Sequence, residues 1–177
     1  SNNVAIGSHA LNVATASNNT AIGYLALTAN TTGAGNNAIG AYSLDANTTG
    51  GNNVALGNSA LSSNTTANDN VAIGVGAMDG NTTGAQNTAV GRGALDLNTT
   101  ADNNTAIGYN TLDANTTGAL NTALGASALG GNTTASSNTA IGAAALVGNT
   151  TGASNVAVGA YALDANTTAS FNTAVGT

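Results

Sequence analysis

One short pattern of apolar and polar positions repeats along the whole chain. Each copy holds Asn, a variable residue, Ala, an aliphatic residue and Gly, as in "NTAIG" from Asn104 to Gly108. After one interval of sixteen residues, the glycines of successive copies are always seventeen apart: Gly7, Gly23, Gly40, Gly57, Gly74, Gly91, Gly108, Gly125, Gly142, Gly159 and Gly176. Most helical solenoids repeat every ~20–50 residues, so this shorter period favours one β-coil per repeat. We predict an all-β protein, a parallel β-solenoid or β-roll of 17-residue coils.

Each coil divides into strand and turn segments. The alternating "N-T/V-A-I-G" predicts a short strand, and the "x-x-A-L-x" that follows the glycine predicts a second one. The segment "DANTTGA", residues 113–119, is rich in residues that favour turns. Asn, Thr-Thr and Gly at every period would interrupt any helix, which excludes a helical repeat.

Stacked coils place equivalent residues in columns, ~4.8 Å apart along the axis. Two aliphatic columns are expected to form the core. The residue before the glycine gives the first column: Ile22, Ile39, Leu56, Ile73, Val90, Ile107, Leu124, Ile141 and Val158. The fourth residue after the glycine gives the second: Leu27, Leu44, Leu61, Met78, Leu95, Leu112, Leu129, Leu146 and Leu163.

Two asparagine columns are equally regular. An amide both donates and accepts, so stacked Asn side chains are expected to form hydrogen-bonded ladders along the axis. The first column is Asn19, Asn36, Asn53, Asn70, Asn87, Asn104, Asn121, Asn138 and Asn155. The second is Asn30, Asn47, Asn64, Asn81, Asn98, Asn115, Asn132, Asn149 and Asn166.

An unbroken alanine column suggests a contact face. Each Ala precedes the aliphatic residue in the strand and therefore points to the opposite side from it. A side facing only water would tolerate larger or polar residues, so we expect these alanines to pack against neighbouring copies of the chain in a parallel homo-oligomer. The residues are Ala21, Ala38, Ala55, Ala72, Ala89, Ala106, Ala123, Ala140 and Ala157.

Composition and charge narrow the function. Seven acidic residues, all Asp, against the single basic residue Arg92 give a net charge of −6, so no nucleic acid or anionic membrane is expected as a partner. The sequence has no Cys, which excludes disulfides and thiolate metal sites. No apolar run approaches the ~20 residues of a membrane span, so no insertion into a bilayer is expected.

Residues 1–177 are expected to form a single array of about ten coils, roughly 50 Å long, because every coil adds one strand spacing. The pattern runs into both ends without the capping units that repeat arrays need. We therefore expect this array to be a segment of a longer fibrous protein.

Candidate catalytic or metal-binding chemistry is sparse. His9 is the only imidazole and no motif places a nucleophile beside it, so an enzyme is not expected. Asp45, Asp79, Asp96, Asp113 and Asp164 share one column, and neighbours there would lie about 5 Å apart. They could share cations, but the glycine- and aspartate-rich signature of calcium solenoids is absent. No metal site and no cofactor are expected.

Other surface features have structural interpretations. Every "NTT" turn matches the acceptor pattern for N-glycosylation, but its Asn belongs to an expected ladder. Tyr24, Tyr42, Tyr109 and Tyr161 follow the glycine at variable positions and are expected to point outward as scattered contact residues.

The recurring "NTAIG", "NVAIG" and "NVALG" strings resemble the Asn-Ser-Val-Ala-Ile-Gly motif of trimeric autotransporter adhesin heads, the YadA-like left-handed β-roll. The longer "NTAIGYxALxxNTTG" unit is similar to repeats of bacterial surface and phage tail-fibre-like proteins. The resemblance covers the whole chain and implies a parallel homotrimer without enzymatic activity, held out from a cell or virion as a rigid spacer that contacts a surface. The repeats of adhesin heads are shorter, and the additional residues here fall in the "NTTGA" turn.

The alternative is a monomeric ice-binding solenoid that orders water with columns of Thr. The first Thr of each "NTT" forms such a column: Thr31, Thr48, Thr65, Thr82, Thr99, Thr116, Thr133, Thr150 and Thr167. Its neighbour in sequence, Thr32 and equivalents, would face the other side if this segment were a strand, so no double Thr array is expected there.

Overall fold

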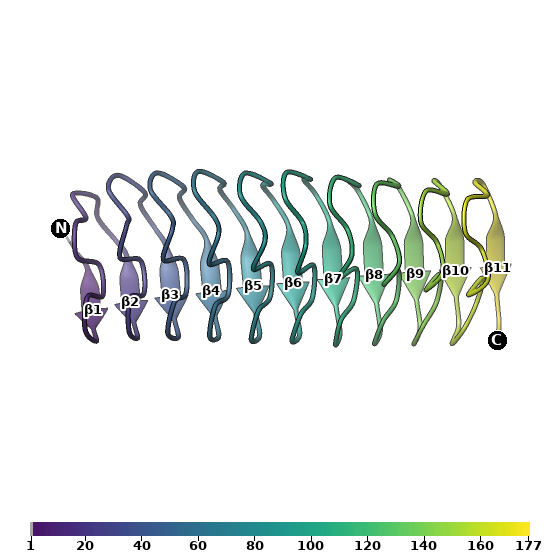
Figure 1. Ribbon diagram of the computed structural model, residues 1–177, viewed down its shortest axis with the longest axis horizontal. Coiled ribbons are helices and arrows are strands. Elements are labelled where there is room, and N and C mark those ends of the chain that lie inside the picture. The colour runs from purple at the N-terminus through teal and green to yellow at the C-terminus, as the bar shows by residue number, and fades with distance from the viewer. Residues whose placement is uncertain (1) are drawn as a thin grey trace.

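The computed structural model describes residues 2–177, which wind into a solenoid with one short strand per coil (Figure 1). The described residues contain no helix. Eleven parallel strands form one sheet in sequence order: β1 Val4–Ile6, β2 Thr20–Ile22, β3 Asn37–Ile39, β4 Val54–Leu56, β5 Val71–Ile73, β6 Thr88–Val90, β7 Thr105–Ile107, β8 Thr122–Leu124, β9 Thr139–Ile141, β10 Val156–Val158 and β11 Thr173–Val175. The predicted all-β parallel solenoid is confirmed.

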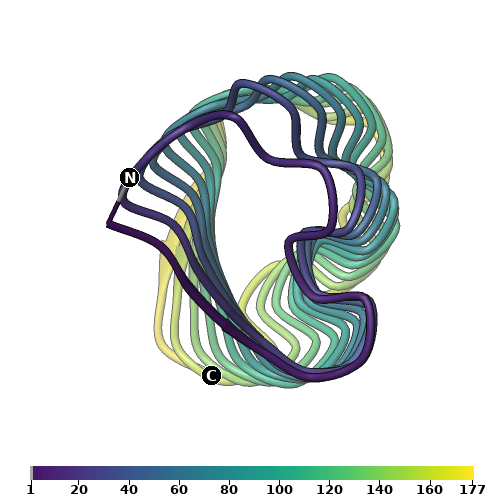
Figure 2. The same ribbon diagram turned by 90° about the vertical axis from the view of Figure 1, so that its left-hand side faces the viewer.

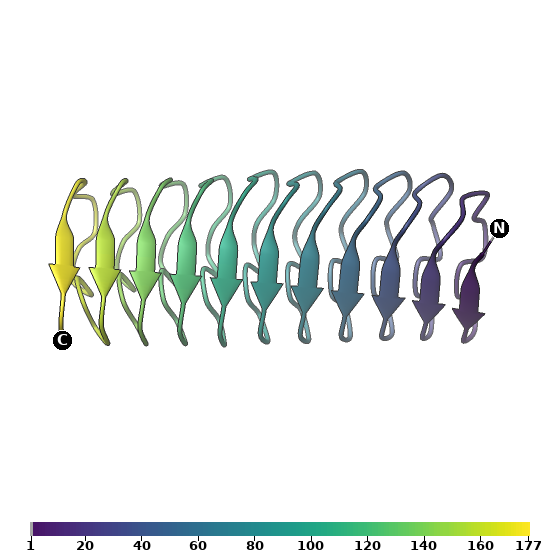
Figure 3. The same cartoon turned by 180° about the vertical axis from the view of Figure 1, so that it is seen from behind.

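The coils stack in strict register. Ala106 pairs with Ala89 on one side and with Ala123 on the other, so residues seventeen apart lie above one another. Viewed from the N-terminal end, the chain turns counterclockwise as it recedes, which makes the winding left-handed (Figure 2). The strands line one side of the solenoid and the turns occupy the rest (Figures 1 and 3).

The predicted second strand of each coil is wrong. The segment after the glycine is a turn, because two of its residues adopt the left-handed backbone conformation, as Asn110 (φ 47°) and Leu112 (φ 54°) do. The preceding Gly108 has φ 140°, and a Cβ there would stand 2.7 Å from the carbonyl carbon of Gly125 in the next coil. Three positive φ angles so close together bend the chain away from the strand direction.

The interior is built mainly from alanine and leucine. The strand alanines and the leucine column, Met78 included, are fully buried wherever a coil has neighbours on both sides, as are most residues of a second small-residue column that includes Ala94 and Ala128. The leucine column is therefore a core column, as predicted. The column that contains Ile22 is not, because its side chains point out of the solenoid: Leu56 is 43% exposed and Leu124 is 45% exposed.

The inward direction of the strand alanines and the outward direction of the Ile22 column have a physical reason. In a strand, every second side chain faces the same way, and the buried Asn104 lies two residues before Ala106. Asn104 and Ala106 therefore point inward together, while Thr105 and Ile107 point outward. The narrow coil accepts Ala at this position, where a larger side chain would collide with the facing turns.

Both predicted asparagine ladders are present. In the first, the Asn104 backbone N–H donates to Asn87 Oδ1 (2.8 Å), and in the second, Asn115 Nδ2 donates to Asn98 Oδ1 (3.0 Å). The two ladders meet, because Asn104 Nδ2 and Asn115 Nδ2 both donate to the Gly118 carbonyl, at 2.8 and 2.9 Å. These buried amides thereby tie the two sides of each coil together and to the next coil.

Candidate functional site

The predicted contact surface does not lie where the sequence placed it. The strand alanines Ala21, Ala38, Ala55, Ala72, Ala89, Ala106, Ala123, Ala140 and Ala157 are each 0% exposed within the single chain. They are covered by the turns of their own coils, so they cannot form a contact face. Their constancy reflects the narrow interior and not a neighbouring polypeptide.

The outward side of the same sheet is the surface that a partner could contact. We define the strand face as the first and third residues of β1–β11. Its first column mixes Thr, Val and Asn: Val4, Thr20, Asn37, Val54, Val71, Thr88, Thr105, Thr122, Thr139, Val156 and Thr173. Its second column is entirely aliphatic: Ile6, Ile22, Ile39, Leu56, Ile73, Val90, Ile107, Leu124, Ile141, Val158 and Val175.

The strand face is regular and long, and its second column is apolar throughout. Parallel strands lie ~4.8 Å apart, so the aliphatic column forms a continuous stripe along the solenoid. Its members in the interior coils are half-buried, as Ile73 is, or exposed, as Ile107 (37%) and Leu124 (45%) are. No charged residue occurs in either column. Long exposed apolar stripes are typical of surfaces that bind another protein.

The aspartate column lies on a different part of the coil, five residues after the glycine. Burial raises the pKa of Asp96, and the negative charges of Asp79 and Asp113 raise it further. Burial also raises the pKa of Asp45 and of Asp113. Ser62 takes the place of an aspartate in one coil and its hydroxyl donates to Asp79 Oδ1. Among residues 2–177, no cluster of three or more acidic or His side chains has a geometry that could hold a metal ion.

The two Thr residues of each "NTT" have different roles. The first lies in a column whose hydroxyls donate to the next coil, as Thr99 Oγ1 does to the Thr116 carbonyl (3.0 Å). The second is exposed in every coil, as at Thr100 and Thr117. The hydroxyls of the Thr31 column, which the ice-binding alternative would use, therefore donate hydrogen bonds within the solenoid.

The remaining candidates occupy scattered positions. His9 is exposed, as expected, and all four tyrosines point outward. Tyr24 and Tyr42 form an edge-to-face pair with ring centres 5.4 Å apart. The Asn of each interior "NTT" is buried with its amide nitrogen donating two hydrogen bonds, as at Asn98, so the folded chain does not present it for glycosylation.

In the described part of the chain, no helix is long and apolar enough to cross a membrane. Comparisons of the chain with protein-family models, with curated proteins and with solved structures find no match. The compatibility of this chain with a β-roll repeat protein therefore rests on its sequence repeat and its structure alone.

Proposed function

We propose that this chain is a structural and adhesive segment of an extracellular fibre on a cell or virion, and that it assembles as a parallel homotrimer through the strand face. The observation that carries the proposal is the uncharged aliphatic stripe of the strand face, partly exposed along the whole array. The segment would act as a rigid spacer and surface-contact module, without catalysis. The sequence resemblance to adhesin heads and tail-fibre-like repeats points the same way.

The size of the strand face supports a protein partner. Eleven strands with two outward residues each supply 22 side chains, and a stable interface takes ~20–30 residues from each partner. Burying the aliphatic column would stabilise the assembly by ~25 cal/mol for each Å² of apolar surface removed from water.

The repeat supports parallel, cyclic packing. Every coil presents nearly the same pair of residues, so copies aligned side by side and in the same direction match coil for coil. A three-fold axis parallel to the solenoid and facing the sheet would place the strand face of each copy between its two neighbours. The axial repeat of each copy would then remain in register along the whole fibre.

The test is the native mass of the purified chain, measured by light scattering and native mass spectrometry. We expect a trimer for the wild type and a monomer for the double variant Ile73→Asn/Ile107→Asn, since Asn37 already occupies the strand face. The matched control is Ala126→Asn/Ala143→Asn, placed in an exposed column that carries Asn58 in another coil. A monomeric wild type, or a trimer unaffected by the double variant, would contradict the proposal.

A second candidate function, a monomeric ice-binding solenoid, is favoured by one observation. The first and third residues of each strand point outward on the same side with a buried Ala between them in the interior coils, so the strand face is a regular two-column array whose first column includes Thr88, Thr105, Thr122 and Thr139. Thermal hysteresis separates the two functions. We expect none from the trimer, whereas strong hysteresis from a monomer would replace the fibre assignment.

A further inference from the structure

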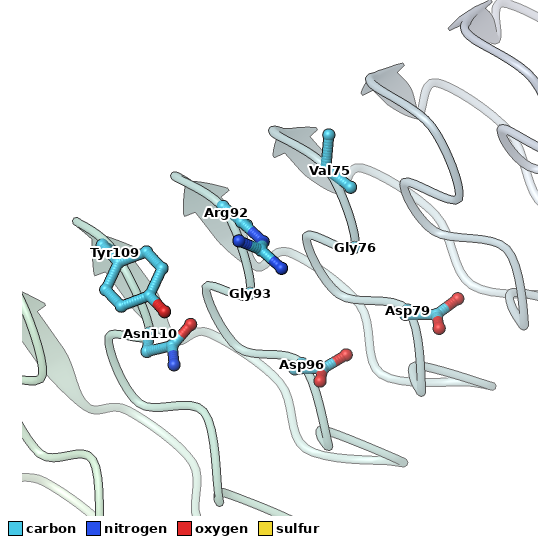
Figure 4. A pocket seen from close by; sticks show the side chains of 8 residues that line it. All are labelled: Val75, Gly76, Asp79, Arg92, Gly93, Asp96, Tyr109 and Asn110. Atoms are coloured by element: carbon cyan, nitrogen blue, oxygen red, sulfur yellow. The ribbon is translucent and has the colours of Figure 1, made fainter.

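Three consecutive coils depart from the repeat together and border a hollow that is open to solvent. It has a volume of about 290 Å³ and lies beyond the carboxyl ends of β5, β6 and β7, outside the strand face (Figure 4). Val75, Arg92 and Tyr109 line one side and two aspartates, Asp79 and Asp96, line the other. A hollow of this volume lies near the lower end of the ~300–1,000 Å³ range of small-molecule sites.

Two glycines open the floor of the hollow. They occupy the second position after the repeat glycine, where other coils carry a side chain in the left-handed conformation, such as Ser59 (φ 54°) and Ser127 (φ 56°). Gly76 (φ 65°) and Gly93 (φ 63°) keep the same backbone without a side chain. A Cβ on Gly76 would meet nothing within 4 Å, so a side chain at this position would extend into open space.

The next coil contributes a polar cover to this floor. Asn110 has the same position in its coil as the two glycines, and its Oδ1 lies 2.6 Å from where a Gly93 Cβ would stand. The Asn110 amide therefore lies over Gly93 and faces the hollow, as Figure 4 also shows. An amide in this position offers both a donor and an acceptor to a ligand.

The walls combine hydrogen-bonding groups with an aromatic surface. The Arg92 guanidinium offers hydrogen-bond donors only, and the carboxylates of Asp79 and Asp96 offer acceptors. Gly76 and Gly93 lie between the arginine and the two aspartates (Figure 4). Tyr109 is 54% exposed, which leaves surface of this residue available for contact with a ligand.

The charged residues that line the hollow limit the class of ligand that it can bind. Two carboxylates against one guanidinium make the hollow net negative, which disfavours phosphates, sulfates and other anions. Burial and the neighbouring charges of Asp79 and Asp113 raise the pKa of Asp96, and hydroxyl groups that donate to this carboxylate would offset both effects. A neutral ligand with many hydroxyls and one less polar face fits donors, acceptors and ring together.

We propose that the hollow bounded by Arg92, Tyr109, Asn110, Asp79 and Asp96 over the floor of Gly76 and Gly93 binds a neutral saccharide residue. The sugar hydroxyls would donate to the two carboxylates and accept from Arg92 and Asn110. The C–H face of the ring would pack on Tyr109. A small site of this kind is expected to bind one sugar weakly, with a Kd of about 1 mM, and to gain strength from multiple copies in a fibre.

Saccharide binding in the hollow would be the surface contact of the proposed adhesive segment, and its biological setting rests on that proposed function. The binding itself does not require the trimer, because no lining residue belongs to the strand face. Native mass tests the assembly and saccharide titration tests the hollow, so failure of one is distinguishable from failure of the other.

The experiment is NMR titration of the ¹⁵N-labelled chain with glucose, galactose, mannose and N-acetylglucosamine, each added separately. At least one sugar is expected to shift the backbone amides of Gly76, Gly93 and Asn110, with half of the full shift reached near the Kd given above. Calcium chloride and sodium sulfate are titrated in parallel. Shifts produced by calcium alone would replace the saccharide site with a cation site, and the absence of shifts with every sugar would overturn the proposal.

Matched variants locate the binding. Gly76→Ser should fill the hollow and weaken binding at least tenfold while keeping the fold, because Ser59 and Ser127 tolerate the same backbone conformation. Its control is Ala144→Ser, in the same column outside the hollow. Tyr109→Ala should also weaken binding, and Tyr24→Ala, in the equivalent position of another coil, should not. Sugar affinity unchanged in Gly76→Ser would place the binding elsewhere and overturn the assignment.

Discussion

At the scale of the residue, backbone conformation decides which aliphatic side chain each column accepts. The core column holds Leu in every interior coil except for Met78, and all of these residues have φ between 51° and 55°. Branching at Cβ is strongly disfavoured in that conformation, whereas Leu and Met branch later or not at all. The strands, which favour β-branched residues, hold most of the Ile and Val.

The positive φ angles of the core column predict the effect of exchanging Leu for its isomer Ile. Leu112→Ile should lower the free energy of unfolding by about 2–3 kcal/mol, because a β-branched residue is placed at φ 54°. Leu112→Met, which copies Met78, should cost less than about 1.5 kcal/mol. Urea unfolding followed by circular dichroism measures both. Equal losses for the two variants would refute the role of Cβ branching.

The aspartate column predicts an unusual dependence of stability on pH. Burial raises the pKa of Asp45, Asp96 and Asp113 above the ordinary value of 3.8, so the folded chain binds protons more readily than the unfolded chain. The contribution of these groups to stability is therefore full below pH 3.8 and declines as the pH rises through the raised pKa values.

We expect the urea midpoint to increase when the pH is lowered from 7 to about 4.5. In the variant with Asn at all three positions this increase should be smaller, and Asp164→Asn, at an exposed position of the same column, serves as the control. A larger increase in the triple variant than in the wild type would contradict the predicted sign.

At the scale of the element, the coil is held by hydrogen bonds more than by apolar burial. Its interior contains two small residues, one Leu or Met and two Asn, so little apolar surface is available. The Asn ladders, the Thr hydroxyls and the backbone bonds between coils supply the remaining contacts. One strand of three residues is enough because each strand from β2 to β10 is paired on both sides within the array.

Breaking one ladder tests this view. Asn115→Ala removes the donor to Asn98 Oδ1 and the acceptor for Asn132 Nδ2, both buried, and should lower the free energy of unfolding by about 2–4 kcal/mol. The control Asn58→Ala replaces an exposed amide in a column where Ala41 already occurs, and should change stability by less than about 0.5 kcal/mol. Equal effects in the two variants would show that the ladder contributes little.

At the scale of the whole molecule, the array is a rod whose sides differ in chemistry. One side is the apolar strand face, and the hollow of β5–β7 opens next to it on the turns (Figures 3 and 4). In the proposed fibre, this separation would let assembly and saccharide contact use different residues. The regular stacking also places the backbone of each coil in hydrogen bonds with its neighbours, which protects it from proteolysis.

Proteolysis measures that protection. Arg92 is the only site for trypsin, and its carbonyl accepts a hydrogen bond from the Asn110 N–H of the next coil (3.0 Å). We expect the native chain to stay intact under conditions in which trypsin cleaves a urea-unfolded sample completely. Rapid cleavage of the native chain at Arg92 would show that the central coils open locally.

The sequence by itself determined the period, the stacking of like residues, the buried Leu column and both Asn ladders. These follow from the spacing of residue types alone, because a coil that repeats every seventeen residues must align its copies. A signal for the orientation of the strand was also present. The first strand position accepts Thr, Val and Asn, as an outward position does, and Ile lies two residues later on the same side.

Only the tertiary structure decided which side of the strand faces inward and where the hollow lies. Ile is more hydrophobic than Ala, and this difference predicted that Ile would face the core. In the structure the strand Ala faces inward, on the same side as the buried Asn two residues before it. The positive φ angles after the glycine likewise turned an expected strand into a bend. Both outcomes depend on the distance between opposite walls of one coil, which a linear pattern of residues does not contain.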